Sequence, residues 1–361
     1  MSADREQARP VRRVAHTRPL YFHDGKLYCA RFDRVYSTTD YGRTFNEEGE
    51  LSVRIPLRQL IKRFRLAQRV MRAAIYRMRV LPDGTTVYTF RGGVYVRRPG
   101  EPTARRTYAV EKGSRPVSLA AGADGTVVFG EYWSNQARDA VRIFGSRDSG
   151  ASWEVLHTFR PGEIRHVHGI SYDRWEDCFW VCTGDEGDEN RLLRASKHFS
   201  ELRIIRQGGQ GNRFYSLIVR EHDLVTATDT PLEDNFICTI DKRTAELKHV
   251  ARIENASFYS CTVGDRTFVS TNAEPSAVND TRTSYVWSGS RDDDWRRVLT
   301  FPADLYHRLT ELPGVPQGLF QYPRIFFPEG ENPGRTLVCH AIGVRGYDGA
   351  MLCFDTEAWA R

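Results

Sequence analysis

The sequence lacks any long hydrophobic run. No apolar stretch approaches the roughly 18 to 20 residues that a membrane-spanning helix needs. The first 16 residues are rich in charge and have no apolar core of the kind that marks a secretory signal peptide. Together these absences predict a chain with no membrane span and a cytoplasmic location.

Cysteine is sparse and is not grouped. The chain has seven cysteines, an odd number, and they stand among valine, phenylalanine and leucine in strand-like runs. This distribution argues against a disulfide framework or a cysteine-based zinc site and predicts buried free thiols. The formal net charge of +6 is a mild excess, so the placement of the basic residues matters more than their number.

What the sequence does contain is a repeat. An apolar run, a turn rich in glycine, aspartate or asparagine, a second β-rich run and a third run ending in a polar corner recur about every 40 to 60 residues. Seven third runs occur, at residues 34–40, 93–98, 141–148, 191–196, 235–241, 284–292 and 350–355. The series predicts an all-β, seven-bladed β-propeller, with six blades as the alternative.

The ends of the chain and two inserts complete this organisation. The last unit has almost nothing after Phe354, whereas residues 10–15 form a strand-like stretch with no unit of its own. We expect that N-terminal strand to complete the last blade and close the ring, because closure removes free sheet edges. Residues 57–75 have the apolar spacing of an amphipathic helix and are otherwise rich in arginine, and residues 303–319 predict a short helix. We expect one domain, residues 1–361.

Two of the polar corners carry a recognisable motif. Residues 146–153 read SRDSGASW and match the pattern S-x-D-x-G-x-x-W at every defined position, and residues 38–45 read TTDYGRTF, a near match. The chain therefore resembles the Asp-box, or BNR-repeat, propellers of the sialidase superfamily. The resemblance implies that each box is a turn between the third and fourth strands of a blade. There the aspartate accepts backbone N–H bonds and the glycine takes a positive φ.

The resemblance extends to the fold and not to sialidase catalysis. It implies that Asp40, Asp148, Gly150 and Trp153 are structural, and that the boxes lie on the face opposite the active site. No nucleophilic tyrosine paired with a glutamate can be matched to the sialidase pattern. Functional residues are therefore expected where the loops that lead into first strands meet those that join second to third strands.

The loop that leads into the fourth unit contains His166 and His168. Two residues apart on a strand, they point to the same side, so they could bind a divalent metal ion or divide acid and base roles. Hydrogen bonding within the loop would explain them equally simply. Asp185 directly follows the second strand of the same unit, as Asp229 does in the fifth and Glu131 in the third. An acidic loop exposed to solvent is the plain alternative for the run around Asp185.

Arginines recur just ahead of first strands, and we expect them to ring the channel and bind a carboxylate or sulfate. They are Arg115, Arg165, Arg213 and Arg324. Exposed arginines flanking strands would be the plain alternative. Gln210 lies in a glycine-rich connector, and Trp133 and Tyr172 could stack on sugar rings, although aromatic residues also dominate the cores between blades.

Three functions fit these residues. The first is a glycoside hydrolase acting on an acidic glycan, with Asp185, Asp229 and Glu131 as candidate carboxylates. The second is a polysaccharide lyase on uronic-acid glycans, in which arginine or a metal ion held by His166 and His168 neutralises the substrate carboxylate. The third is a binding propeller without catalysis. Nucleic-acid binding is not expected because no reading motif accompanies the basic helix, and the sequence leaves the oligomeric state open.

Overall fold

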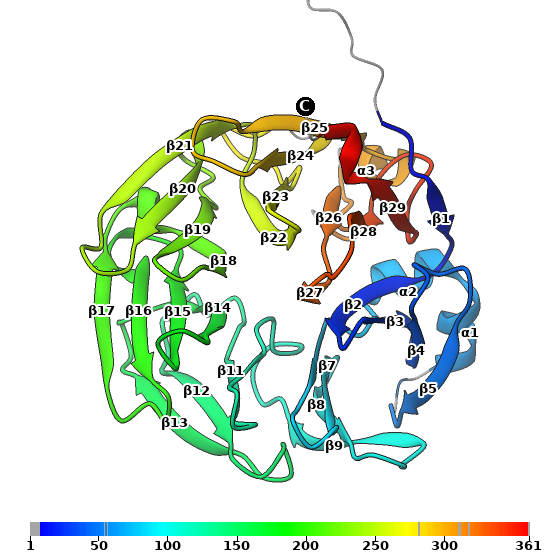
Figure 1. Ribbon diagram of the computed structural model, residues 1–361, viewed down its shortest axis with the longest axis horizontal. Helices are drawn as coiled ribbons and strands as arrows, with labels where there is room; N and C mark the ends of the chain where they lie inside the picture. The colour runs from blue at the N-terminus through cyan, green and yellow to red at the C-terminus, as the bar shows by residue number, and fades with distance from the viewer. Residues whose placement is uncertain are drawn as a thin grey trace, which may run out of the picture.

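The computed structural model describes residues 8–53, 55, 57–280, 282–309, 312–316 and 318–359. Most of its regular secondary structure is β-strand, in antiparallel sheets that stand side by side around a common centre (Figure 1). The fold is a β-propeller, as the repeat predicts. In the described part of the chain, no helix is long and apolar enough to cross a membrane.

Four of the described sheets are meanders of strands that follow one another in sequence. Each of these sheets has four strands, and strands that are neighbours in the sequence are also neighbours in the sheet. One consists of β10 (Ala120–Ala121), β11 (Val127–Gly130), β12 (Val141–Ser146) and β13 (Glu154–Phe159). The next consists of β14 (His166–Asp173), β15 (Cys178–Gly184), β16 (Arg191–Ser196) and β17 (Leu202–Gln207), and it is followed by the sheet of β18 (Phe214–Val219), β19 (Asp223–Thr228), β20 (Asn235–Asp241) and β21 (Leu247–Ile253). Another consists of β22 (Ser257–Val263), β23 (Arg266–Thr271), β24 (Thr283–Gly289) and β25 (Arg296–Pro302).

A nine-stranded sheet contains two further meanders. They are β2 (Arg18–His23), β3 (Lys26–Arg31), β4 (Arg34–Thr38) and β5 (Asn46–Leu51), and β6 (Arg77–Val80), β7 (Thr86–Phe90), β8 (Gly93–Arg97) and β9 (Thr103–Ala109). A short parallel pairing between β5 and β9 joins their outer strands, and β27 (Glu329–Gly330) pairs with β2. All seven predicted third runs are strands, namely β4, β8, β12, β16, β20, β24 and β29 (Met351–Asp355).

The remaining sheet combines the two ends of the described chain. Its order is β1 (Arg12–Val14), β29, β28 (Thr336–Ile342) and β26 (Arg324–Phe326). β1 pairs antiparallel with β29, with Arg12 opposite Cys353 and Val14 opposite Met351. The expected partner of the N-terminal strand is therefore confirmed, and Figure 1 shows β1 at the outer edge beside β29.

The turns at residues 38–45 and 146–153 have the geometry that their sequence motif predicts. Both turns join the third strand of a meander to the fourth, β4 to β5 and β12 to β13. Asp148 accepts hydrogen bonds from the backbone N–H of Ser152 and from the hydroxyls of Ser146 and Ser152. Gly150 has φ of 82°, a conformation that residues with a Cβ rarely adopt. Asp40 makes the same kinds of contact in its own turn.

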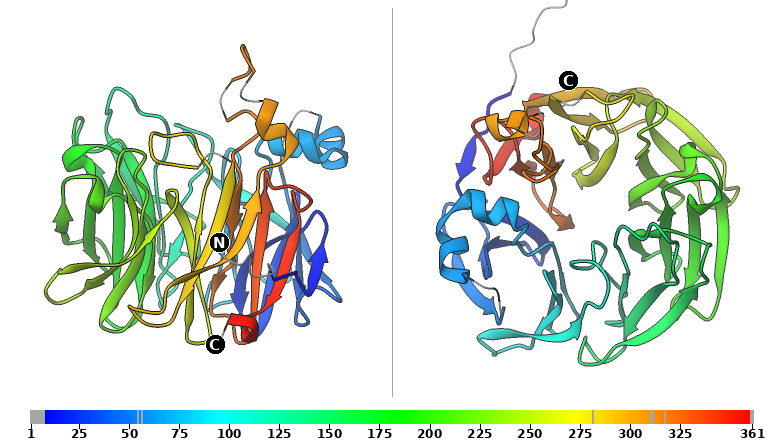
Figure 2. Two further views of the ribbon diagram at one scale, coloured as in Figure 1. Left: turned by 90° about the horizontal axis from the view of Figure 1, so that it is seen from above. Right: turned by 180° about the vertical axis from the view of Figure 1, so that it is seen from behind.

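The basic insert forms two short helices where the spacing predicts one. α1 (Arg58–Arg63) and α2 (Arg65–Val70) are separated by Phe64, whose backbone is extended. The break lets α1 bury Ile61 while α2 buries Arg69. The buried Arg69 guanidinium pairs with Asp304, just ahead of α3 (Leu305–Leu309), the expected helix of the second insert. Figure 2 (left) shows the three helices together at one face of the ring.

The first strands carry irregularities near the channel. The pairing register shifts within the first four residues of four of them: β2 between Pro19 and Tyr21, β14 between Val167 and Gly169, β18 between Phe214 and Leu217, and β22 between Ser257 and Tyr259. Such bulges bend a strand and re-aim the extra side chain. The seven cysteines, by contrast, are free, and six are buried in the sheets, as predicted.

Candidate functional site

The starts of the first strands line a cavity of about 150 Å³ at the face that carries the helices. Arg18 begins β2, Tyr76 precedes β6, Tyr259 lies near the start of β22 and Arg324 begins β26. The described lining includes five arginines and no aspartate or glutamate, the arginines being Arg18, Arg65, Arg72, Arg115 and Arg324. The basic insert, residues 57–75, contributes two of them, Arg65 and Arg72. The lining of the cavity therefore carries an excess of positive charge.

Arg18 is the most deeply buried of these arginines. Its guanidinium stacks over the rings of Phe326 and Tyr76, at 4.1 and 5.1 Å from their centroids, and donates to the Tyr76 carbonyl. Among the described residues, no carboxylate lies within ion-pair distance of Arg18 or Arg115. Burial lowers the pKa of Arg18 to about 10, and repulsion from Arg115 adds to the shift. A buried cation without a counter-charge favours binding of an anion beside it.

Three tyrosines meet at the floor of the cavity. The Tyr76 hydroxyl lies 3.2 Å from that of Tyr215 and is hydrogen-bonded to that of Tyr259. Burial alone would raise the pKa of Tyr76, but Arg77 and Arg115, together with these hydrogen bonds, bring it below the ordinary value of tyrosine. Burial raises the pKa of Tyr215 and of Tyr259. Of the three hydroxyls, that of Tyr76 therefore ionises most easily.

A larger cavity, of about 790 Å³, lies on the other side of the tyrosines. Both cavities are lined by Val117, Tyr215 and Tyr259. These side chains therefore lie between the two cavities. Tyr172 lines the larger cavity and donates to Asp177. It lies six residues beyond His166 on β14, which corresponds to about 20 Å along an extended strand. Tyr172 is therefore absent from the site where it was expected.

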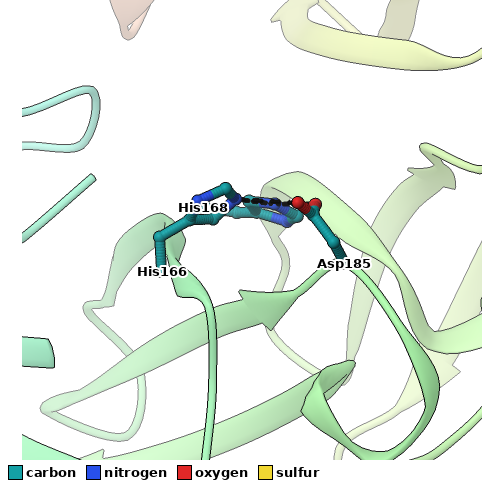
Figure 3. A group of neighbouring side chains, drawn as sticks. All are labelled: His166, His168 and Asp185. Carbon is teal, nitrogen blue, oxygen red and sulfur yellow. Dashed lines mark hydrogen bonds and ion pairs between the residues drawn. The ribbon is translucent and has the colours of Figure 1, made fainter. Parts of the chain in front are cut away.

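A second group of side chains, the His–Asp cluster, consists of His166, His168 and Asp185 (Figure 3). The two Nε2 atoms lie 2.9 Å apart, and Asp185 Oδ1 lies 3.1 Å from Nε2 of His168 and 3.5 Å from Nε2 of His166. All three residues are buried. The sequence placed these residues near one another, and the structure brings them into direct contact.

The backbone around the cluster explains how this contact arises. The bulge in β14 falls at His168, so the strand does not simply alternate there. Gly169 packs so closely on β18 that a Cβ would lie 2.3 Å from the Tyr215 carbonyl oxygen. Gly184, just before Asp185, has φ of 142°, and a Cβ there would lie 2.1 Å from Asn190 Oδ1. Glycine is therefore required at both positions.

Two arginines surround the Asp185 carboxylate. Arg165 Nη1 lies 2.9 Å from Oδ2, and Arg213 Nη2 lies 3.0 Å from Oδ1. Burial alone would raise the pKa of the Asp185 carboxyl, but hydrogen bonds from the protonated forms of His166 and His168 hold it well below the ordinary value. Burial lowers the pKa of His168 to about 4. Arg165 and Arg213, expected to line the channel with Arg115 and Arg324, instead hold this aspartate.

Asp229 is the second carboxylate of the region. Arg213 Nε lies 3.5 Å from Asp229 Oδ2, so one guanidinium connects Asp229 with Asp185. Burial raises the pKa of Asp229 well above the ordinary value, and Glu274 and Asp185 add to this against the opposing effect of Arg213. Gln210, in η2 (Gln210–Asn212), donates to the Asp185 carbonyl at 3.0 Å. Apart from Tyr172, the sequence-predicted residues of units four and five therefore form one network.

Glu131 and Trp133 have other roles. Glu131 accepts from the backbone N–H of Arg142 and from both ends of its guanidinium. Its carboxylate is thus neutralised within its own blade. The Trp133 carbonyl contacts His166, while its ring packs against the core and under Lys112. Neither side chain belongs to the described lining of the arginine-rich cavity.

Sequence reasoning missed Arg18, Tyr76 and Tyr259. Each lies at or near the start of a first strand. Arg115 and Arg324 were predicted as channel residues because they stand at this same position. The same search applied to the first, second and sixth units would have found them. Arg18 precedes a proline at the start of β2, and Tyr76 is followed directly by Arg77.

Comparison with known proteins supports the fold and nothing finer. No protein-family model matches the sequence, and no curated protein does. Among solved structures, a chain of a mitotic checkpoint complex is similar with a TM-score of 0.57 and 12% identity, over 98% of this chain and 94% of that one. An ancestral GH74 enzyme is similar with a TM-score of 0.53 and 11% identity, over 94% of this chain and 44% of that one. At such identities these likenesses concern the β-propeller fold alone.

Proposed function

We propose that this protein is a carbohydrate-active enzyme that acts on a saccharide carrying a carboxylate, and that its reaction is an elimination with Tyr76 as the base. One observation carries the proposal: a cavity with five arginines and no carboxylate in its described lining is floored by a tyrosine whose pKa is lowered. Guanidinium groups suit carboxylates because their planar fork donates two parallel hydrogen bonds.

The enclosed part of the cavity is small, with room for a carboxylate and the edge of the sugar ring that carries it. Its volume is about 150 Å³, comparable with the cavity of about 150 Å³ that admits a benzene ring in an engineered protein. Burial lowers the pKa of both Arg18 and Arg115, and among the described residues neither has a carboxylate within ion-pair distance. We assign them to the substrate carboxylate, which would lie within reach of the Tyr76 hydroxyl.

The elimination then follows from these positions. Arginines that neutralise the carboxylate acidify the C–H bond next to it. The Tyr76 phenolate takes that proton, the electron pair of the C–H bond becomes a C=C bond, and the bond to the glycosidic oxygen breaks. The leaving oxygen then takes the proton back from Tyr76. The hydroxyls of Tyr215 and Tyr259, which lie within hydrogen-bond distance of Tyr76, would donate to the phenolate and stabilise it between these steps.

Hydrolysis of the same class of saccharide is the second candidate. It is favoured by Asp185 and Asp229, two carboxylates that share Arg213 and whose pKa values are shifted in opposite directions. Such a pair suits an acid and a base in glycoside hydrolysis. Neither aspartate, however, belongs to the described lining of the two cavities.

The products distinguish these reactions. The full chain is incubated with a panel of uronic-acid oligosaccharides while the ultraviolet absorbance of a new C=C bond and the release of reducing ends are both followed. We expect absorbance to rise, and Tyr76→Phe to lower kcat by about 10²- to 10⁴-fold, the usual contribution of an acid–base group. Tyr36→Phe, which removes a hydroxyl on β4 outside the cavity, serves as the control.

Each other outcome has a clear meaning. Reducing ends without absorbance, together with loss of activity in Asp229→Asn, would replace elimination by hydrolysis. Binding of the oligosaccharides without either product would make the protein a binding propeller. Full elimination activity in Tyr76→Phe would remove Tyr76 from the reaction.

We further propose that the sheets make seven blades, each meander of the nine-stranded sheet counting as one, and that β1 closes the ring. The pairing of β1 with β29 supports closure, and the Asp-box turns support membership of the Asp-box propellers. The free cysteines are consistent with the predicted cytoplasmic location, since disulfides are rare in that compartment.

A further inference from the structure

The His–Asp cluster has a place for a positive charge between its rings. His166 Nδ1 lies 2.9 Å from the Trp133 carbonyl oxygen, and His168 Nδ1 lies 3.0 Å from the Phe214 carbonyl oxygen. A carbonyl oxygen only accepts hydrogen bonds, so both Nδ1 atoms carry the ring proton. In the neutral rings each Nε2 then has a lone pair, and these two nitrogens face one another at 2.9 Å.

The carboxylate completes this arrangement. Asp185 Oδ1 lies 3.1 and 3.5 Å from the two Nε2 atoms. Three atoms with lone pairs therefore converge, within 4.8 Å of one another, in a buried site. Without a cation between them they repel one another, so the geometry is that of a ligand set.

We propose that Nε2 of His166, Nε2 of His168 and Oδ1 of Asp185 bind a divalent transition-metal ion. A tetrahedral ion with bonds of about 2.0 to 2.1 Å sets its ligands about 3.3 Å apart. The three distances of 2.9, 3.1 and 3.5 Å bracket that value. Two imidazoles with one carboxylate suit Zn²⁺, Fe²⁺ or Mn²⁺ better than Ca²⁺ or Mg²⁺.

The surroundings orient the ligands as in known metal sites. The carbonyls of Trp133 and Phe214 fix the histidine rings, which is the usual role of groups behind a metal-bound imidazole. Arg165 holds Oδ2 of Asp185, and Arg213 approaches Oδ1. Because a carboxylate oxygen has two lone pairs, Oδ1 can accept from Arg213 and bind an ion together.

A second group of potential metal ligands consists of Asp173, Glu176 and Cys178. In this group the carboxylate already has partners within the protein. The Asp173 carboxylate is already bound by Lys242, by the Trp180 indole and by two backbone N–H groups. Its lone pairs are therefore used within the fold. The His–Asp cluster is the better site because its Nε2 lone pairs face only one another and Asp185.

The experiment measures metal binding alone, so it does not depend on the proposed saccharide activity. Full-length protein treated with a chelator is titrated calorimetrically with ZnCl₂, and with MgCl₂ for comparison. We expect about one Zn²⁺ per chain and no comparable Mg²⁺ binding. His168→Gln and Asp185→Asn should each weaken Zn²⁺ binding by at least about 10- to 100-fold. His222→Gln, which removes an exposed histidine, should bind as the unmodified protein does.

Folding of each variant is checked by circular dichroism and thermal melting. Co²⁺ provides a second readout, because its visible absorption reports the ligand set. We expect the band of the unmodified protein to persist in His222→Gln and to change in Asp185→Asn. Absence of Zn²⁺ binding by the folded protein, or equal affinity in the double variant His166→Gln/His168→Gln, would overturn the proposal. The cation between the rings would then be a proton.

Discussion

The ring of Tyr132 packs against that of His166 at a tilt of 35°, with centroids 4.2 Å apart, and the same tyrosine lines the arginine-rich cavity. Tyr215 makes a second connection, since its ring lies 5.7 Å from that of His168 and it also lines the cavity. Burial raises the pKa of Tyr132, and Asp185 and Asp229 add to the shift, so this hydroxyl stays neutral. The His–Asp cluster thus lies directly behind one wall of the cavity.

The uncompensated charge of Arg18 predicts an anion-dependent stability. A ligand that binds only the folded state raises stability in proportion to the logarithm of its concentration above Kd. We expect sodium glucuronate to raise the melting temperature more than sodium chloride at equal ionic strength. In Arg18→Met the extra rise should disappear, because the buried cation is gone, while the melting temperature without glucuronate should be equal or higher.

Arg98→Met is the control for this measurement, since Arg98 is exposed, directly follows β8 and does not line the cavity. It should keep the full response to glucuronate. A response of equal size in Arg18→Met would mean that the anion binds elsewhere, and no response in the unmodified protein would count against the arginine-rich cavity as an anion site.

The strands were predictable because their signal is local. Each third run alternates apolar residues and ends in a polar corner, so the sequence located β4, β12 and β20 without tertiary information. His166, His168 and Asp185 could also be predicted from the sequence, because each lies at the end of a predicted strand that faces the channel. Tyr172 was misplaced because a side chain near the far end of a first strand lies toward the other mouth of the channel.

Charge pairing, in contrast, could not be read from the sequence. Arg115 and Arg165 occupy similar positions ahead of first strands, yet only Arg165 meets an aspartate. Which arginine is paired depends on loops of neighbouring blades that differ in length. The break between α1 and α2 at Phe64 could not be predicted either. It accompanies the contact of Arg69 with Asp304, and these two residues are 235 positions apart in the sequence.

Asp229 predicts a specific pH dependence of stability. Burial raises its pKa in the folded state well above the value of about 3.9 in an unfolded chain. The protonated form therefore contributes stability that is fully present below about pH 4 and is lost as the pH rises through the folded pKa. Asp229→Asn does not titrate, so its melting temperature relative to the unmodified protein should rise steadily from acidic to neutral pH.

Melting curves of both proteins across that range check this expectation. Asp234→Asn, at an exposed position paired with Arg252, controls for the loss of a carboxylate and should show no such rise. If the difference between Asp229→Asn and the unmodified protein stayed flat with pH, Asp229 would be ionised in the folded state. Its role as the acid in hydrolysis would then be removed as well.

The pairing of β1 with β29 predicts that deletion of residues 1–16 weakens the fold. The deletion uncovers an edge strand that contains the buried residues Met351 and Cys353, and an unpaired apolar edge favours aggregation. For a chain of this size we expect the melting temperature to fall by roughly 5 to 10 °C, with more light scattering on heating.

Val11→Ser is the control, because the exposed Val11 contributes its backbone N–H to Cys353 whatever its side chain. An unchanged melting curve in the deletion would mean that β1 contributes nothing to closure. The last blade would then be stable with three strands, and six full blades would be the better description of the ring.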